Sequence, residues 1–256
     1  MIRLACRRAR PALAGALALT GALVAAGCGS SSPSSHTSAS PGRGATPGAS
    51  HATAAPPAAS HATAVPAADV ALVDGSPITV AGYDSWVQIA VKTAAAESPG
   101  SSLIVPTGPP EFSSCVAQER SQDSQLAATP VAQLRADCEQ VFTPLNREVM
   151  DFLIRGKWYL ADAAAHGISF TASQTQQALG SQTRSQYPTA AGFQRFLRQT
   201  GQTEQDVIYR VQISEAQAAL SNRTSGGLKA VDADVQQRYR ADTFCAPQYR
   251  IADCAG

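Results

Sequence analysis

The feature that most constrains the fold of this chain is a run of helix-forming sequence centred on residues 158–168. Upstream of it, apolar residues recur at three- and four-residue steps, as on a helix with one buried face: Leu145, Val149, Phe152, Leu153 and Leu160. His166 and Gly167 end this pattern, because glycine adopts the left-handed cap conformation at little steric cost and Ile168 can then fold back. The sequence therefore predicts a helical domain built on one long helix.

Three shorter helices are predicted downstream from their start and stop signals. Ser173 or Thr171 can cap a helix over residues 174–179, and Gly201 can close the helix that follows. The apolar positions of that third helix are Phe193, Phe196 and Leu197. Thr203 can cap a fourth helix, and the helix dipole favours acids in its first turn. Two acids stand there, Glu204 and Asp206.

Upstream of the long helix, the folded part is predicted to begin near Asp69 with a strand over residues 70–73. A turn at Asp74 and Gly75 follows, and residues 76–79 lead into a helix. The inward positions of that helix are Tyr83, Trp86, Val87, Ile89 and Ala90.

Between this helix and the long one, residues 97–114 are rich in Pro, Gly and Ser and are expected to be irregular. Thr129 and Pro130 form a predicted cap and first-turn pair for the next helical stripe. Pro144 lacks an N–H and clashes with the preceding turn, so it either kinks one long helix or separates two.

The two ends of the folded part are expected to meet. A last helix is predicted over residues 231–240, with Val235 and Tyr239 facing inward. A single strand cannot satisfy its own backbone N–H and C=O groups, so residues 70–73 need a partner. Residues 248–253 are the other credible strand, and we expect the two to form a small two-stranded sheet.

Parts of this pattern resemble the N-terminal chaperone region of the SurA/PrsA family of exported chaperones and foldases. The opening strand, turn and Tyr-x-x-Trp spacing match it, and so do later positions: Trp158, Ala163, Gly167, Ile168, Phe193, Leu197, Gly201, Thr203 and Asp206. The resemblance implies a mainly α, SurA N-terminal or trigger-factor-like helical domain over residues 69–256, joined by the small sheet. It also implies binding of unfolded or exported polypeptides.

Many members of that family carry a parvulin-type prolyl isomerase domain, which we do not expect here. Only sixteen residues follow Arg240 and none is histidine. No nucleophile elbow, phosphate-binding loop or dinucleotide fingerprint occurs. The acid pairs at residues 204/206 and 232/234 are explained by capping and the helix dipole. We therefore expect no enzymatic activity and no cofactor.

The N-terminus is typical of an export signal over residues 1–27. Four arginines precede an uncharged, Ala- and Leu-rich run over residues 11–26, which is shorter than the about 20 residues of a membrane span. Small residues directly before Cys28 resemble the lipobox of bacterial lipoproteins. This predicts lipidation at Cys28 and attachment to the extracytoplasmic face of the cell membrane. The alternatives are an ordinary cleaved signal with a chance Cys28, and export by either the general or the twin-arginine route.

Residues 28–68 read as the lipidated cysteine followed by a disordered spacer of Ser, Ala, Pro and Thr. Three isolated histidines, at positions 36, 51 and 61, make a poor metal site without carboxylates or cysteines.

Four cysteines remain for the domain: Cys115, Cys138, Cys245 and Cys254. They allow three pairings, and outside the cytosol disulfides are the default interpretation. We favour local pairing, Cys115–Cys138 and Cys245–Cys254. Zinc is disfavoured because no Cys-x-x-Cys pair exists and His166 is the only histidine of the domain, so no metal site is expected.

Charge disfavours nucleic acid as a partner. From residue 69 onward the chain has fifteen Lys and Arg against nineteen Asp and Glu, a net charge of −4, with no basic stripe.

Two function classes remain. One is a lipid-anchored holdase that binds unfolded or exported polypeptides; the other is a structural or adaptor lipoprotein of the cell envelope that binds one specific partner. Aromatic residues at helical spacing are mostly core, and at most one or two would line a groove. The candidates are Trp86, Phe152, Trp158, Phe193 and Phe196.

Overall fold

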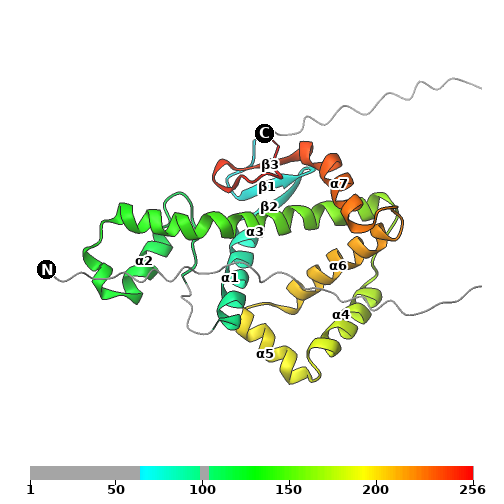
Figure 1. The fold of residues 1–256 in the computed structure, drawn as a ribbon, viewed down its shortest axis with the longest axis horizontal. Coiled ribbons are helices and arrows are strands. Elements are labelled where there is room, and N and C mark those ends of the chain that lie inside the picture. Colours follow the sequence, from blue (N-terminus) through cyan, green and yellow to red (C-terminus); the bar gives the residue numbers. More distant parts are fainter. Residues whose placement is uncertain (1–63, 99–103, 256) are drawn as a thin grey trace, which may run out of the picture. The chain divides into compact units, whose positions relative to one another are not determined.

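The computed structural model describes residues 64–98 and 104–255 (Figure 1). The predictions for the signal peptide, for Cys28 and for most of the spacer lie outside these residues. Residues 64–68, at the end of the predicted spacer, contact the folded part. Val65 packs against the core, and the Ala68 carbonyl accepts a hydrogen bond of 2.9 Å from the Val80 N–H.

The long helix predicted around residue 158 is α3 (Val131–Ala165), and Pro144 lies inside it. Its end has the expected glycine cap: Gly167 has a φ of +69°, and the Ile168 N–H donates to the Ala163 carbonyl at 2.8 Å. The start differs from the prediction. Pro130 occupies the N-cap position without a capping side chain, so Thr129 does not cap the helix.

A three-stranded antiparallel sheet joins the two ends of the domain, in the order β2-β1-β3. Its strands are β1 (Asp69–Val73), β2 (Ser76–Thr79) and β3 (Thr243–Cys245). The expected meeting of the ends is confirmed, but two details of it were wrong. Residues 76–79 form a strand, because Asp74 and Gly75 both have positive φ and fold the chain back as a hairpin.

The second error concerns the partner of β1. Leu72 pairs with Phe244, whereas residues 248–253 form no strand: Pro247–Tyr249 is a single 3₁₀ turn, η3. The disulfide between Cys245 and Cys254 holds that tail folded back beside β3. The favoured cysteine pairing is confirmed, since the other disulfide joins Cys115 to Cys138.

The remaining helices of the main core are α1 (Val80–Glu97), α2 (Ser113–Gln122), the 3₁₀ turn η1 (Ser124–Ala128) and α7 (Gly227–Tyr239), which a second 3₁₀ turn, η2 (Arg240–Asp242), connects to β3. The Cys115–Cys138 disulfide links α2 to α3. Helix α7 begins four residues earlier than predicted, directly after Gly226, whose φ is +112°.

Helices α4 (Ala172–Gln186), α5 (Ala190–Thr200) and α6 (Glu204–Ser221) have the predicted caps. Thr171 and Thr203 each form a capping box, and Gly201 takes the left-handed conformation. In Figure 1 the sheet and α7 lie along one side of α3, and α4, α5 and α6 lie on the other. A small second core holds α4–α6 together: Leu179, Leu197, Val207 and Val211.

Candidate functional site

The structure separates the five aromatic candidates into three places. Trp158 is completely buried, and its indole N–H donates to the Thr243 hydroxyl at 3.0 Å. A side chain without exposed surface cannot line a groove for a partner. We therefore remove Trp158 from the candidate site and assign it to the core.

Trp86 and Phe152 come together with a residue that the sequence pattern did not single out, Tyr209. Trp86 lies on α1, Phe152 on α3 and Tyr209 on α6. The ring centroids of Trp86 and Phe152 are 4.7 Å apart, and Tyr209 lies 6.0 Å and 5.9 Å from them. All three side chains are only partly buried. Three helices thus present one aromatic surface at their junction.

Arg210 completes this surface. Its guanidinium carbon lies 5.1 Å from the centre of the Trp86 ring and 5.7 Å from that of Phe152, within the range of cation–π attraction. We call Trp86, Phe152, Tyr209 and Arg210 the Trp86 cluster. Sequence reasoning missed its two α6 members because only the crossing of α6 over α3 brings them to Trp86.

Arg210 has no ion pair among the described residues, and its Nε is buried without a hydrogen-bond partner. Burial lowers the pKa of Arg210, and the charge of Asp206 partly opposes that shift. The Asp206 carboxylate is engaged elsewhere, since it accepts hydrogen bonds from the Thr203 N–H at 2.7 Å and the Thr203 hydroxyl at 2.6 Å. The cluster therefore carries a cation whose charge is not matched by a hydrogen-bonded anion.

A buried glycine allows this close approach of α6 to α3. A Cβ atom on Gly156 of α3 would lie 2.8 Å from the Tyr209 hydroxyl oxygen and 2.6 Å from Ile213 Cδ1. Real Cβ atoms do not come that close, so any larger residue at position 156 would displace the end of the Tyr209 or Ile213 side chain. Burial also raises the pKa of Tyr209 to about 12, which keeps its hydroxyl neutral.

Phe193 and Phe196 lie apart from the Trp86 cluster, in α5. They pack with Tyr187, at the end of α4, with centroid distances of 5.8 Å and 4.8 Å. Both phenylalanines are partly buried against the small second core. Sequence reasoning did not name Tyr187, which is positioned only once α4 and α5 fold against each other.

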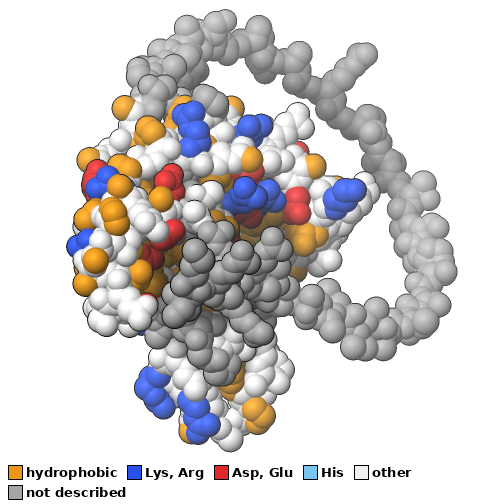
Figure 2. Space-filling view, turned by 60° about the vertical axis from the view of Figure 1, so that its left-hand side comes forward, with side chains coloured by type: hydrophobic (Ala, Val, Ile, Leu, Met, Phe, Trp, Pro, Cys, Tyr) orange, Lys and Arg blue, Asp and Glu red, His pale blue; other side chains and the backbone are white. Residues whose placement is uncertain are grey.

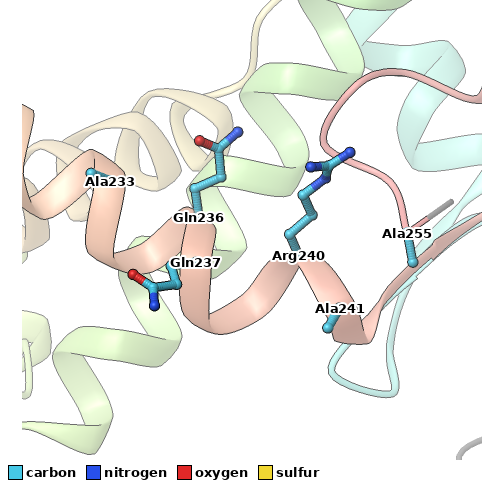
Figure 3. A pocket seen from close by; sticks show the side chains of 6 residues that line it. All are labelled: Ala233, Gln236, Gln237, Arg240, Ala241 and Ala255. Atoms are coloured by element: carbon cyan, nitrogen blue, oxygen red, sulfur yellow. The ribbon is translucent and has the colours of Figure 1, made fainter.

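An open depression lies beside α7 and the C-terminal tail (Figure 3). Its lining is made of small apolar side chains, two amides and one guanidinium: Ala233, Gln236, Gln237, Arg240, Ala241 and Ala255. None of these groups is a general base or a nucleophile at neutral pH. The depression therefore offers no constellation for acid–base or covalent catalysis.

One group of potential metal ligands occurs in the described part of the chain, at Cys115, Glu119 and Cys138. The two sulfur atoms are bonded to each other. Because cysteine binds metals as the thiolate, neither is available as a ligand in this form. Burial raises the pKa of the Glu119 carboxyl, and the charge of Asp137 raises it further.

Within the described ranges, no helix combines the length and apolarity needed to cross a membrane. Comparison of the chain with protein-family models, with curated proteins and with solved structures found no match.

Proposed function

We propose that this chain is an exported, lipid-anchored holdase whose helical domain binds apolar segments of unfolded polypeptides at the Trp86 cluster. The observation that carries the proposal is the position of Trp86, Phe152 and Tyr209: three partly exposed aromatic rings from three different helices form one surface. Aromatic side chains that remain partly exposed after folding offer apolar area that a client segment can cover, at about 25 cal/mol per Å².

The composition of the cluster supports binding. Tryptophan, tyrosine and arginine are the residues that most often dominate the energetics of protein interfaces. All are present in the Trp86 cluster, whereas the described residues provide no catalytic constellation at the depression beside α7. The resemblance of the sequence to the SurA/PrsA chaperone region points in the same direction. Anchoring through Cys28 would keep such a domain at the membrane surface, where exported chains emerge unfolded.

The test is suppression of aggregation of several unrelated unfolded proteins by the chain from residue 28 onward with Cys28→Ser, which carries no lipid. Phe152→Ala should lose most of this activity because it removes the central ring of the cluster. Phe170→Ala is the matched control, since Phe170 is also a partly buried phenylalanine packed against the main core. Thermal melts of both variants check that they are comparably folded. Equal suppression by the two variants would refute the assignment of the site.

A second function, adaptor for one specific envelope partner, is favoured by one observation. Arg210 is a desolvated cation without an ion pair among the described residues, which suits a carboxylate of a defined partner better than a run of apolar residues. The adaptor function would be favoured if the chain does not protect unrelated clients from aggregation but binds one partner stoichiometrically, and if Arg210→Gln abolishes that binding.

A further inference from the structure

The segment that contains α4 and α5, residues 167–203, differs in charge from the rest of the domain. We call it the α4–α5 arm. It contains three basic residues, Arg184, Arg195 and Arg198, and no Asp or Glu. The other described residues contain twelve Lys and Arg against nineteen Asp and Glu. A domain with a net charge of −4 is therefore divided into an arm of +3 and a remainder of −7.

The three arginines of the arm are all exposed, and none forms an ion pair with a described residue. The end of the molecule where α4 and α5 lie in Figure 1 is the lowest lobe of Figure 2. On the face seen in Figure 2, that lobe shows Lys and Arg side chains together with hydrophobic ones and no acidic side chain. A fourth cation adjoins the arm, because the side chain of Lys92 on α1 packs over Gly201.

Apolar surface accompanies these charges. Tyr187, Phe193 and Phe196 surround the turn between α4 and α5 and are all only partly buried. The first acids after the arm, Glu204 and Asp206, lie beyond the other end of α5, and Asp206 is engaged in its capping box. The α4–α5 arm thus combines aromatic rings at its turn with guanidinium groups on both helices that form no ion pair with a described residue, a combination found in protein segments that lie at a membrane interface.

We propose that the α4–α5 arm docks on an anionic membrane surface. The arginines are spread over two helices and point outward as separate charges, which matches a plane of many phosphate headgroups. A single acidic peptide would be held better by converging or bidentate guanidinium groups. The remainder of the domain, at −7, is repelled by the same surface. The division of charge therefore orients the domain with the arm toward the lipid.

This docking is independent of client binding at the Trp86 cluster, and it does not require the lipid on Cys28. Docking of the arm would orient the domain relative to the membrane, which a lipid on Cys28 alone does not do.

The experiment measures co-flotation of the chain from residue 28 onward, with Cys28→Ser, with vesicles of equimolar phosphatidylglycerol and phosphatidylcholine. Phosphatidylcholine vesicles provide the neutral comparison. We expect binding to the anionic vesicles alone. Each basic residue near such a surface contributes about a fivefold gain in binding, so Arg184→Gln, Arg195→Gln and Arg198→Gln together should weaken it about 100-fold.

A matched control removes the same charge elsewhere. Arg147, Arg240 and Arg250 are also exposed and form no ion pair with a described residue, and replacing all three with Gln should leave at least most of the vesicle binding intact. Salt should abolish binding of the parent chain at 1 M, where the screening length is about 3 Å.

Three results would overturn the proposal: equal loss in the two triple variants, equal binding to neutral vesicles, or binding to poly-glutamate without binding to anionic vesicles. The last result would identify an acidic polypeptide as the partner of the arm. Aggregation suppression by the arm variant is measured in parallel. If the arm variant loses vesicle binding but still suppresses aggregation, the arm acts independently of the Trp86 cluster. Phe152→Ala should show the opposite result, with vesicle binding kept and aggregation suppression lost.

Discussion

Trp158 and Thr243 are joined by a hydrogen bond of 3.0 Å from the indole N–H to the threonine hydroxyl, and both side chains are completely buried. The same hydroxyl donates to the Tyr239 carbonyl at 2.8 Å. One side chain on β3 therefore connects the C-terminal half of α3 with the end of α7. This contact explains why the tryptophan in the long helix has a structural role.

The first prediction follows from this contact. Thr243→Val keeps the shape of the side chain but leaves the buried indole N–H and the Tyr239 carbonyl without their partner. It should lower the free energy of unfolding by about 2 kcal/mol. Thr243→Ser retains the hydroxyl and should cost about 1 kcal/mol for the lost methyl group. Urea unfolding measures both; equal losses would mean that the hydrogen bonds contribute little.

The second prediction concerns Asp253, a buried carboxylate in the C-terminal tail. It accepts hydrogen bonds from Arg155 Nε at 2.8 Å and from Gln236 Nε2 at 2.9 Å, so it joins the tail to α3 and α7. Asp253→Ala should lower the free energy of unfolding by about 2 kcal/mol, because both donors lose a charged acceptor. Arg155 keeps a second partner in Asp151 at 2.9 Å, which limits the loss.

The control for Asp253 is Asp137→Ala, at an exposed acid on α3, which should change stability by about 0.5 kcal/mol or less. A loss of similar size in both variants, measured in the same urea titrations, would contradict a bridging role for Asp253.

Local signals predicted most of the helices correctly, whereas long-range pairing did not follow from the sequence. Gly167, Gly201 and Thr203 act within one helical turn, so their roles can be read from neighbouring residues. One of the two partners of β1, β3, lies more than 160 residues away along the chain. Thr243–Cys245 is only three residues long, which is too short to give a recognisable alternating pattern. Ser76–Thr79 contains a proline, which is uncommon in strands.

The candidate site shows the same division. Trp86 and Phe152 were recognisable as aromatic candidates on predicted helices. Their contact with Tyr209 and Arg210 depends on how α1, α3 and α6 cross, which no short-range pattern encodes. Trp158 is excluded from the site because it is completely buried. The periodicity of the sequence places it on the inward face of a helix but does not predict its degree of burial.

The third prediction is a pH dependence that originates at Glu119. This side chain is nine-tenths buried, its Oε2 has no hydrogen-bond partner in the described part of the chain, and burial raises its pKa. A carboxyl with a raised pKa binds more protons in the folded than in the unfolded state. Its contribution to the free energy of unfolding therefore falls as pH rises from the unfolded pKa, about 4.3, through the folded one.

Glu119→Gln removes that titration. The variant should be more stable than the parent chain by about 1 kcal/mol at neutral pH, and this advantage should shrink toward zero below about pH 4. Urea unfolding at several pH values measures it, with the exposed Glu139→Gln as control. An advantage that does not change with pH would show that the charge of Glu119 is not its source.

The fourth prediction is lipid attachment at Cys28, which rests on the sequence alone. Mass spectrometry of the native N-terminus should find a diacylglyceryl adduct on Cys28, and Cys28→Ala should release the protein from the membrane fraction. An N-terminus that is cleaved elsewhere and carries no lipid would contradict the proposal that the protein is anchored to the membrane. The binding activities proposed for the Trp86 cluster and the α4–α5 arm would not be affected.

The fifth prediction tests how α3 positions the Trp86 cluster. In Gly156→Ala the new methyl group would lie 2.6 Å from Ile213 Cδ1 and 2.8 Å from the Tyr209 hydroxyl oxygen, so the ends of these side chains must shift, and we expect the contacts of Tyr209 with Trp86 and Phe152 to change. Overpacking of about 2 kcal/mol is partly offset by the gain of about 1 kcal/mol for alanine over glycine in a helix. The net loss of stability is then about 1 kcal/mol, while aggregation suppression should fall much further.

Gly180→Ala on α4 is the matched control, because its methyl group would meet only the end of the Arg184 side chain, at 3.2 Å. It gains the same helix propensity and should be about 1 kcal/mol more stable than the parent chain, with aggregation suppression unchanged. Thermal melts, client aggregation and the emission of Trp86, read in a Trp158→Phe background, distinguish the two variants. If Gly156→Ala leaves both the emission and the client binding as they are in Gly180→Ala, the position of Tyr209 does not determine the site.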